Sequence, residues 1–316
     1  MNLSRLTLAI ACATLAPAAL ACSSCGCTLN ADWSSQGLKT GSGLSFDLRH
    51  DRFDQNELRS GTGKVDTAAI TVPTDQEIQQ QTLNRNTTLS VDYGTDNGWG
   101  VTLRLPWIDR THTTIAEGDT DVSGSASSSI GDVRLLGRYQ GFAPERDWGL
   151  QFGLKLPTGA TDVNFNSGPQ AGQPLDRGLQ PGTGTTDLLL GVFSFGPINQ
   201  QLDYFAQALL QQPLNSKDGF KPGTGVNVTG GVRWIGEGAL VPQLQINGRI
   251  EGRESGANAD VPNSGATLFY LSPGATLSLT DKLQAYGFVQ VPIYQRVNGL
   301  QLETKVSASI GLHYAY

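Results

Sequence analysis

Hydrophobic and polar residues alternate one by one along much of the chain. One such run places apolar side chains at Trp99, Val101, Leu103, Leu105 and Trp107. A second run places them at every other position from Val306 to Tyr316. Alternation with a period of two is typical of a β-strand with one apolar face. Each run lasts roughly ten residues, which exceeds the ~5–6 residues of an ordinary soluble strand and fits the ~9–11 residues with which a tilted strand crosses a bilayer.

About twelve runs of this kind follow one another, an even number of the kind found in single-chain bacterial barrels. The sequence therefore predicts an all-β protein, a transmembrane antiparallel β-barrel. Its strands are expected near 44–53, 84–93, 99–108, 132–142, 148–156, 186–195, 202–212, 225–235, 240–250, 267–279, 283–294 and 303–316.

The connections between these runs alternate in length. Short turns are expected at 94–98, 143–147, 196–201, 236–238 and 280–282, and long loops at 54–83, 109–131, 157–185, 213–224, 251–266 and 295–302. Outer-membrane barrels combine short periplasmic turns with longer extracellular loops. The same order places both ends of the chain in the periplasm.

Aromatic residues gather near the ends of the expected strands, where the interfacial girdles of a membrane barrel lie. The last strand also ends on an aromatic residue, Tyr316. We therefore expect Tyr316 to act as an assembly signal that the barrel-assembly machinery reads.

If the apolar positions face lipid, the polar positions face the lumen, because strands in a bilayer must close to satisfy their backbone groups. The basic residues predicted to line the lumen are Arg49, Arg104, Arg134, Arg138, Lys155, Arg233, Arg249 and Lys305. They could favour anionic solutes, as charged rings do in pores. Alternatively they pair across the bore with Asp47, Asp132, Asp203, Glu251 and Glu303, and the near balance of charges slightly favours this second interpretation.

The N-terminus has the features of a secretory signal. A short basic beginning with Arg5 is followed by an apolar run from Leu6 to Leu20, which is too short to span a membrane as a helix. The small residues Ala19 and Ala21 flank the expected cleavage point. We expect residues 1–21 to be removed, residues 22–43 to form a cysteine-containing periplasmic arm, and residues 44–316 to form the barrel.

Three cysteines, Cys22, Cys25 and Cys27, open the expected mature chain. Thiolates at this spacing could bind a soft ion such as copper or zinc, or act as a redox site that docks a periplasmic partner. A structural disulfide in an oxidising compartment would leave one thiol over. A lipid anchor on Cys22 is the third interpretation, although Ala19 stands where such signals usually carry leucine.

Net charge and the small number of histidines disfavour two classes of function, nucleic-acid binding and catalysis. The net charge of −6 disfavours nucleic acid as a partner. Only His50, His112 and His313 are present, and the chain shows no Ser/His/Asp spacing or HExxH pattern. His50 is expected on the lipid-facing side, His112 in a loop and His313 in the lumen. We therefore predict that the protein is not an enzyme.

Three ordered stretches carry a family resemblance. They are Ile130-Gly-Asp-Val133, Gly153-Leu-Lys-Leu-Pro-Thr-Gly159 and Gln180-Pro-Gly-Thr-Gly-Thr-Thr-Asp187, followed by Leu271-Ser-Pro-Gly274 and Val291-Pro-Ile-Tyr294. Over roughly residues 44–316 the chain resembles the outer-membrane transporter family named after meta-pathway phenol degradation. The resemblance implies a monomeric barrel that takes up small organic molecules.

These observations together predict an outer-membrane pore or transporter for small solutes, embedded in the lipid bilayer of the outer membrane. The alternative is a non-conducting outer-membrane scaffold that binds copper or zinc, or docks a redox partner, through Cys22, Cys25 and Cys27.

Overall fold

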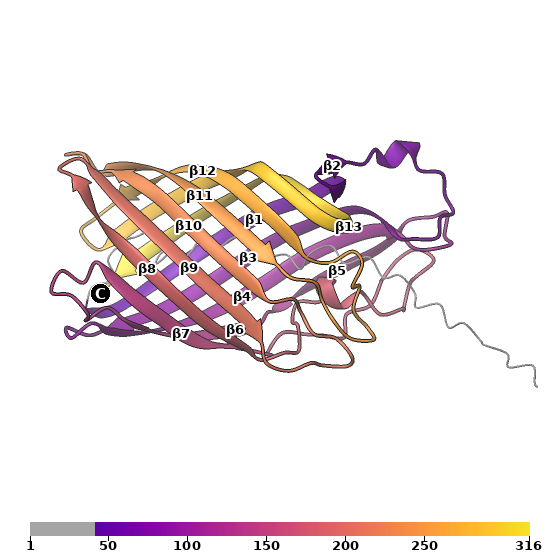
Figure 1. The fold of residues 1–316 in the computed structure, drawn as a ribbon, viewed down its shortest axis with the longest axis horizontal. Coiled ribbons are helices and arrows are strands. Elements are labelled where there is room, and N and C mark those ends of the chain that lie inside the picture. Colours follow the sequence, from indigo (N-terminus) through magenta and orange to yellow (C-terminus); the bar gives the residue numbers. More distant parts are fainter. Residues whose placement is uncertain (1–41) are drawn as a thin grey trace, which may run out of the picture.

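The computed structural model describes residues 42–316, which form one antiparallel β-sheet that closes on itself. The strands follow one another around the sheet in chain order, and β13 pairs with β1 to complete the barrel (Figure 1). Their bounds are β1 Gly43–Gly61, β2 Gly63–Lys64, β3 Ile78–Gly94, β4 Trp99–Ile115, β5 Ser123–Ile130, β6 Val133–Tyr139, β7 Trp148–Leu156, β8 Asp187–Asn199, β9 Leu202–Pro213, β10 Gly225–Trp234, β11 Leu240–Glu251, β12 Ala266–Ser278 and β13 Leu283–Ala315. Within residues 42–316, two short 3-10 helices, Thr67–Ala69 and Arg177–Leu179, lie in the long loops.

Strand β13 supplies two antiparallel walls of the barrel. Its residues up to Val297 pair with β12, and the residues that follow pair with β1. The chain reverses at Gly299, whose φ of +59° lies in the left-handed region that favours glycine. Within residues 42–316, the predicted twelve strands result when these two runs are counted separately, β5 and β6 are counted as one interrupted position beside β4, and the two-residue β2 is left out. The loop expected at 295–302 is therefore largely replaced by strand.

Short and long connections lie at opposite ends of the barrel, as the sequence predicts. In Figure 1 the short turns and the C-terminus share one end, while β2, β5 and the long loops occupy the other. At the short-turn end the backbone N–H of Tyr316 donates a hydrogen bond to the carbonyl oxygen of Leu44 at 2.9 Å.

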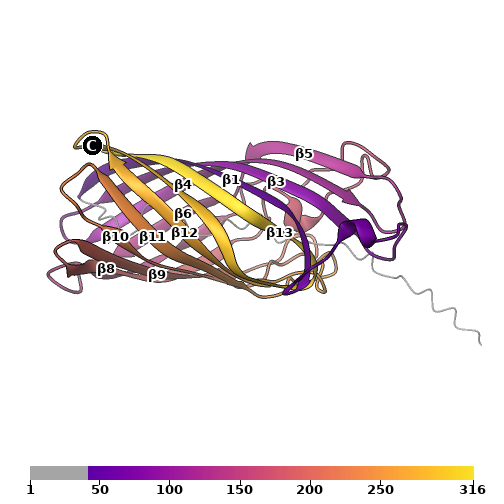
Figure 2. The same cartoon turned by 90° about the horizontal axis from the view of Figure 1, so that it is seen from above.

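The wall formed by β1, β3 and β4 is longer than the alternation indicates. These strands continue to Gly61, from Ile78 and to Ile115, and β5 pairs with the extension of β4 (Figure 2). Side chains on both faces of the extension are mostly polar, so the period of two disappears from the sequence there. As a result His112, which was expected in a loop, lies within β4 opposite Thr82 of β3.

Inside and outside differ as a membrane barrel requires. On β1, Phe46 and Leu48 are exposed while Asp47 and Arg49 are buried. Near the short-turn end aromatic rings pack in a row around the outer surface, with Trp99, Tyr139, Phe142 and Trp148 spaced 4.5 to 4.8 Å between neighbouring ring centroids. No helix within residues 42–316 is long and apolar enough to span a membrane.

Candidate functional site

Most of the basic residues predicted to face the lumen are buried within the barrel. Between 2% and 7% of the residue is exposed at Arg49, Arg104, Arg138, Lys155, Arg233 and Arg249. Arg134 is partly buried, and its guanidinium donates to Oε1 of Gln211 at 3.5 Å.

Carboxylates accompany most of these cations. The ion pairs join Arg49 with Asp51, Arg138 with Asp92, Lys155 with Asp132 and Asp187, Arg233 with Asp203, and Arg249 with Glu251. The charged atoms are close together: Lys155 Nζ, for example, lies 3.0 Å from Asp132 Oδ2. Asp132, Asp203 and Glu251 are among the predicted partners, whereas Asp47 accepts a hydrogen bond from Tyr286. The pairs lie along one strand or between nearby strands rather than across the bore, and their compensating charges favour pairing over a ring of uncompensated cations.

Lys305 does not face the lumen, as the sequence predicts, but the outside of the barrel. The register between β1 and β13 shifts between the pairs Phe53–Ser307 and Gln55–Thr304. This bulge sets both Lys305 and Val306 opposite Asp54 on the outer side of the wall, and both are exposed. The sequence could not reveal the shift, because a bulge changes the face of a residue without changing the residue types around it.

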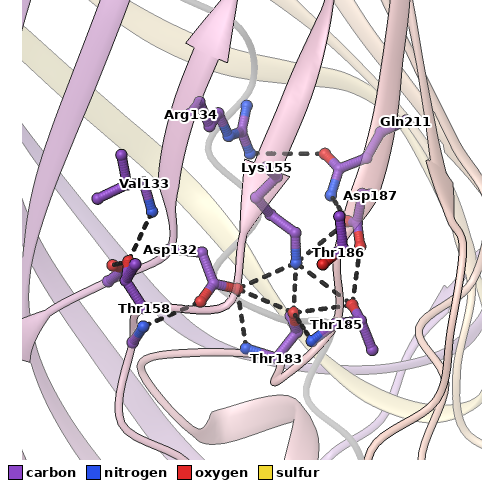
Figure 3. Close-up of polar contacts among 12 residues, drawn as sticks. Asp132, Val133, Arg134, Lys155, Thr158, Thr183, Thr185, Thr186, Asp187 and Gln211 are labelled. Atoms are coloured by element: carbon purple, nitrogen blue, oxygen red, sulfur yellow. Dashed lines mark hydrogen bonds and ion pairs between the residues drawn. The ribbon is translucent and has the colours of Figure 1, made fainter.

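Lys155 is the centre of a buried polar network at the end of β7 (Figure 3). Its ammonium lies 3.0 Å from Asp132 Oδ2 and 3.1 Å from Asp187 Oδ2, and it also donates to Thr183 Oγ1. Asp132 accepts further hydrogen bonds from the backbone N–H and the hydroxyl of Thr183, at 2.9 and 2.8 Å. Thr185 Oγ1 donates to Asp187 at 2.7 Å, so each carboxylate has several donors.

The network brings together the first three sequence stretches of the family resemblance. Asp132 follows β5, Lys155 is the last residue but one of β7, and Thr183 to Asp187 lead into β8. The backbones on either side touch at Gly159 and Gly182, where a Cβ on Gly182 would lie 2.4 Å from the Gly159 carbonyl oxygen. The glycines and the charged residues of these motifs therefore fix both ends of the loop between β7 and β8.

This loop, residues 157–186, packs against the barrel wall at the long-loop end. The Arg110 guanidinium of β4 donates to the carbonyl of Leu179 at 2.6 Å and to Asn84 Oδ1 at 2.6 Å. Phe165, Leu175 and Leu179 form a small apolar core within the loop. The ring of Phe165 lies 6.4 Å from that of His112. Because Arg110 and His112 are buried residues of β4, the loop folds onto the barrel rather than away from it.

Asp176 precedes the 3-10 helix of this loop and lies among other carboxylates. Burial raises the pKa of Asp176 well above its usual range, and the nearby charges of Glu77, Asp260 and Glu254 raise that pKa further. The four residues come from three separate parts of the chain and are all buried. His112 Nε2 approaches Glu77 Oε1 at 3.8 Å. This cluster was absent from the sequence prediction, because nothing in the sequence shows that these segments meet.

An apolar strip inside the barrel was also missed. Leu136, Leu189 and Leu209 form one buried cluster, and Phe193, Phe195 and Phe205 form another. Strand β8 carries apolar residues on both faces, with Leu189 and Phe193 buried but Leu190 and Val192 exposed. The strip crosses β6, β8 and β9. A run that is apolar on both faces has no clear period, so its inward members could not be separated from its outward ones.

The metal prediction concerns a part of the chain that the structure does not describe. Cys22, Cys25 and Cys27 lie outside residues 42–316, as does the expected signal. Within the described residues there is no group of three or more His, Cys, Asp or Glu side chains that could hold a metal ion.

Comparisons with known proteins support the fold. No protein-family model and no curated protein matches the chain. The structure is similar to that of the COG4313 outer membrane channel from Pseudomonas putida F1, with 13% sequence identity, a TM-score of 0.61, and coverage of 88% of this chain and 97% of that one. This likeness shows that the chain has the fold of an outer-membrane β-barrel.

Two further solved structures are less similar. The translocator domain of the autotransporter NalP from Neisseria meningitidis matches with 10% identity, a TM-score of 0.48, and coverage of 90% of this chain and 92% of that one. The Ralstonia pickettii toluene transporter TbuX matches with 11% identity, a TM-score of 0.44, and coverage of 89% and 91%. Both are too distant to support a conclusion about this chain.

Proposed function

We propose that the protein is an outer-membrane channel through which small solutes diffuse passively. The signal at residues 1–21 would direct export, and both ends of the mature chain would lie in the periplasm. A closed barrel with an apolar outer surface and paired charges inside supports this function, because such a wall is stable in lipid and its interior accepts polar groups.

The apolar strip indicates the class of solute. Leu136, Leu189, Leu209 and Phe205 are between 0% and 4% exposed, so an apolar or aromatic body would contact them where it displaces their present packing. Gln151 and Gln207, which are buried beside the strip on β7 and β9, would bind a polar substituent of the same solute. Pockets for small molecules are commonly apolar with a few placed polar groups. The inward apolar side chains of β8 and β9 are the observation that carries this proposal.

Planar-bilayer recordings of the mature protein test it. We expect single-channel conductance, and we expect L-phenylalanine to reduce the current more strongly than L-alanine, because the two solutes differ by one phenyl group. Replacing Leu189 and Phe205 by serine should remove this difference. Leu190→Ala, an outward change on the same strand, is the control and should preserve it.

Two outcomes would count against the proposal. Equal current reduction by both amino acids would reject the apolar preference. A barrel that conducts neither with nor without residues 22–43 would reject the channel and favour the scaffold, in which Cys22, Cys25 and Cys27 bind copper or zinc.

A further inference from the structure

Basic side chains gather on the outer face of three neighbouring strand runs, the last run of β13 together with β1 and β3. Arg52 of β1 is exposed, and its direct cross-strand partner is Arg85 of β3, whose side chain is 42% exposed. Lys305 of β13 lies on the other side of β1, at the bulge opposite Asp54. Arg296, on the adjoining run of β13, is also exposed.

The positive charges of this group outnumber the carboxylates that face them. Like charges directly opposite each other on one face of a sheet destabilise the pairing. The carboxylates that face this group are Asp109, which pairs with Arg85 at 3.5 Å, and Asp54, which accepts a hydrogen bond from Gln81 at 2.8 Å. Within residues 42–316, Arg52, Arg296 and Lys305 form no ion pair or hydrogen bond. An anion seated between the strands would relieve the repulsion.

The patch lies directly beyond the apolar band, toward the long loops. Along β1 the outward residues Phe46 and Leu48 precede Arg52. Along β4 the outward Trp107, 52% exposed, precedes Asp109. Tryptophan at such a position marks the boundary between hydrocarbon and headgroups. On the opposite wall the outward side chains at the same ends of β7 and β11 are the apolar Leu156 and Ile250.

We propose that Arg52, Arg85 and Lys305, with Arg296 on the adjoining run of β13, bind the phosphate groups of a phosphorylated glycolipid in the outer leaflet, with lipid A as its chemical type. Arginine donates paired hydrogen bonds that suit phosphate, and the apolar band below offers contacts for the acyl chains. The inference rests on the orientation given by the proposed function, in which the long loops face outward.

A lipid-binding experiment tests this surface. The mature protein in non-ionic detergent is titrated with diphosphoryl lipid A, with lipid A lacking both phosphates, and with inorganic phosphate, and bound lipid is counted by native mass spectrometry. The test variant is Arg52→Gln/Lys305→Gln, which leaves the Arg85–Asp109 pair intact. The control, Lys217→Gln/Lys221→Gln, removes the same charge from the loop between β9 and β10.

We expect the wild-type protein and the control to bind diphosphoryl lipid A, and the test variant to bind it at least about tenfold more weakly, the size of losing charge-assisted phosphate contacts. Heat-modifiable migration of the test variant confirms that its barrel is folded. Equal binding by the test variant, or equal binding of the dephosphorylated lipid, would overturn the proposal. Full displacement by millimolar inorganic phosphate would show a site for the free ion instead.

Conductance measured on the same preparations separates this proposal from the channel function. A barrel that binds diphosphoryl lipid A but does not conduct contradicts the channel alone. A conducting barrel without phosphate-dependent lipid binding contradicts the patch alone.

Discussion

At the scale of single residues, Lys155 shows how a charge can be held inside a membrane barrel. Its side chain is 3% exposed and those of Asp132 and Asp187 are 7% and 0% exposed. The desolvation of three charges is offset only because each carboxylate also accepts hydrogen bonds from threonine hydroxyl or backbone groups. The stability of this region therefore depends on the complete set and not on any single pair.

Lys155→Met should lower the free energy of unfolding by about 3–5 kcal/mol, since two buried carboxylates lose their cation. Urea unfolding in lipid vesicles, followed by tryptophan fluorescence, measures the loss. Adding Asp132→Asn and Asp187→Asn should recover most of it. A triple variant as unstable as Lys155→Met would show that packing, not charge, is decisive.

Gly182→Ala should also destabilise the protein, by about 1–3 kcal/mol, because the new Cβ would meet the backbone of Gly159. The matched control is Gly236→Ala in a short turn, where nothing lies within 4 Å of the added atom, and its effect should stay within about 0.5 kcal/mol. The same unfolding assay compares them. Equal stability of the two variants would mean that the loop adjusts at the Gly159–Gly182 contact.

At the scale of elements, the loop between β7 and β8 is attached at both ends by the Lys155 network and at Leu179 by Arg110. The raised pKa of Asp176 adds a dependence on pH. Because the folded loop favours the uncharged carboxyl, its stability is complete below the ordinary pKa of aspartate, about 3.9, and is lost as the pH rises through the raised pKa.

Hydrogen exchange of residues 163–180 should therefore be slower at pH 5 than at pH 8, after correction for the intrinsic rates. Asp176→Asn should make the protection independent of pH over this range, because the amide remains uncharged beside Glu77, Glu254 and Asp260. A wild-type loop with the same protection at both values would contradict this expectation.

The closing strand is the second element whose role can be tested. The last run of β13 pairs with β1 as far as Ala315, and Tyr316 itself is 81% exposed, so deleting it removes few contacts from the folded barrel. If Tyr316 is an assembly signal, its deletion should reduce insertion in cells while leaving the stability of the inserted barrel nearly unchanged. Loss of stability without loss of insertion would assign it a structural role instead.

At the scale of the whole molecule, β1 pairs with β13, so neither strand is left with an open edge. The outward side chains form an apolar surface. Such barrels resist unfolding by detergent until heated. We expect the protein to fractionate with outer membranes and to migrate faster on a gel before boiling than after. Recovery as a soluble periplasmic protein would be incompatible with this structure in a membrane.

The sequence alone determined that the chain forms about twelve antiparallel strands and that short and long connections alternate. These follow from local periodicity, since a strand with one face in lipid must alternate, as the run from Trp99 to Trp107 does. Two of the ion pairs inside, Arg49 with Asp51 and Arg249 with Glu251, fit the same pattern, because residues two apart share a face.

Only the tertiary structure decided which distant segments meet. The bulge at Lys305, the apolar inner face of β8, the position of His112 within β4 and the grouping of Asp176 with Glu77, Glu254 and Asp260 all depend on register and loop packing. Three motifs separated along the chain join around Lys155 for the same reason. Register and loop contacts are set by interactions between residues far apart in sequence, and local periodicity carries no record of them.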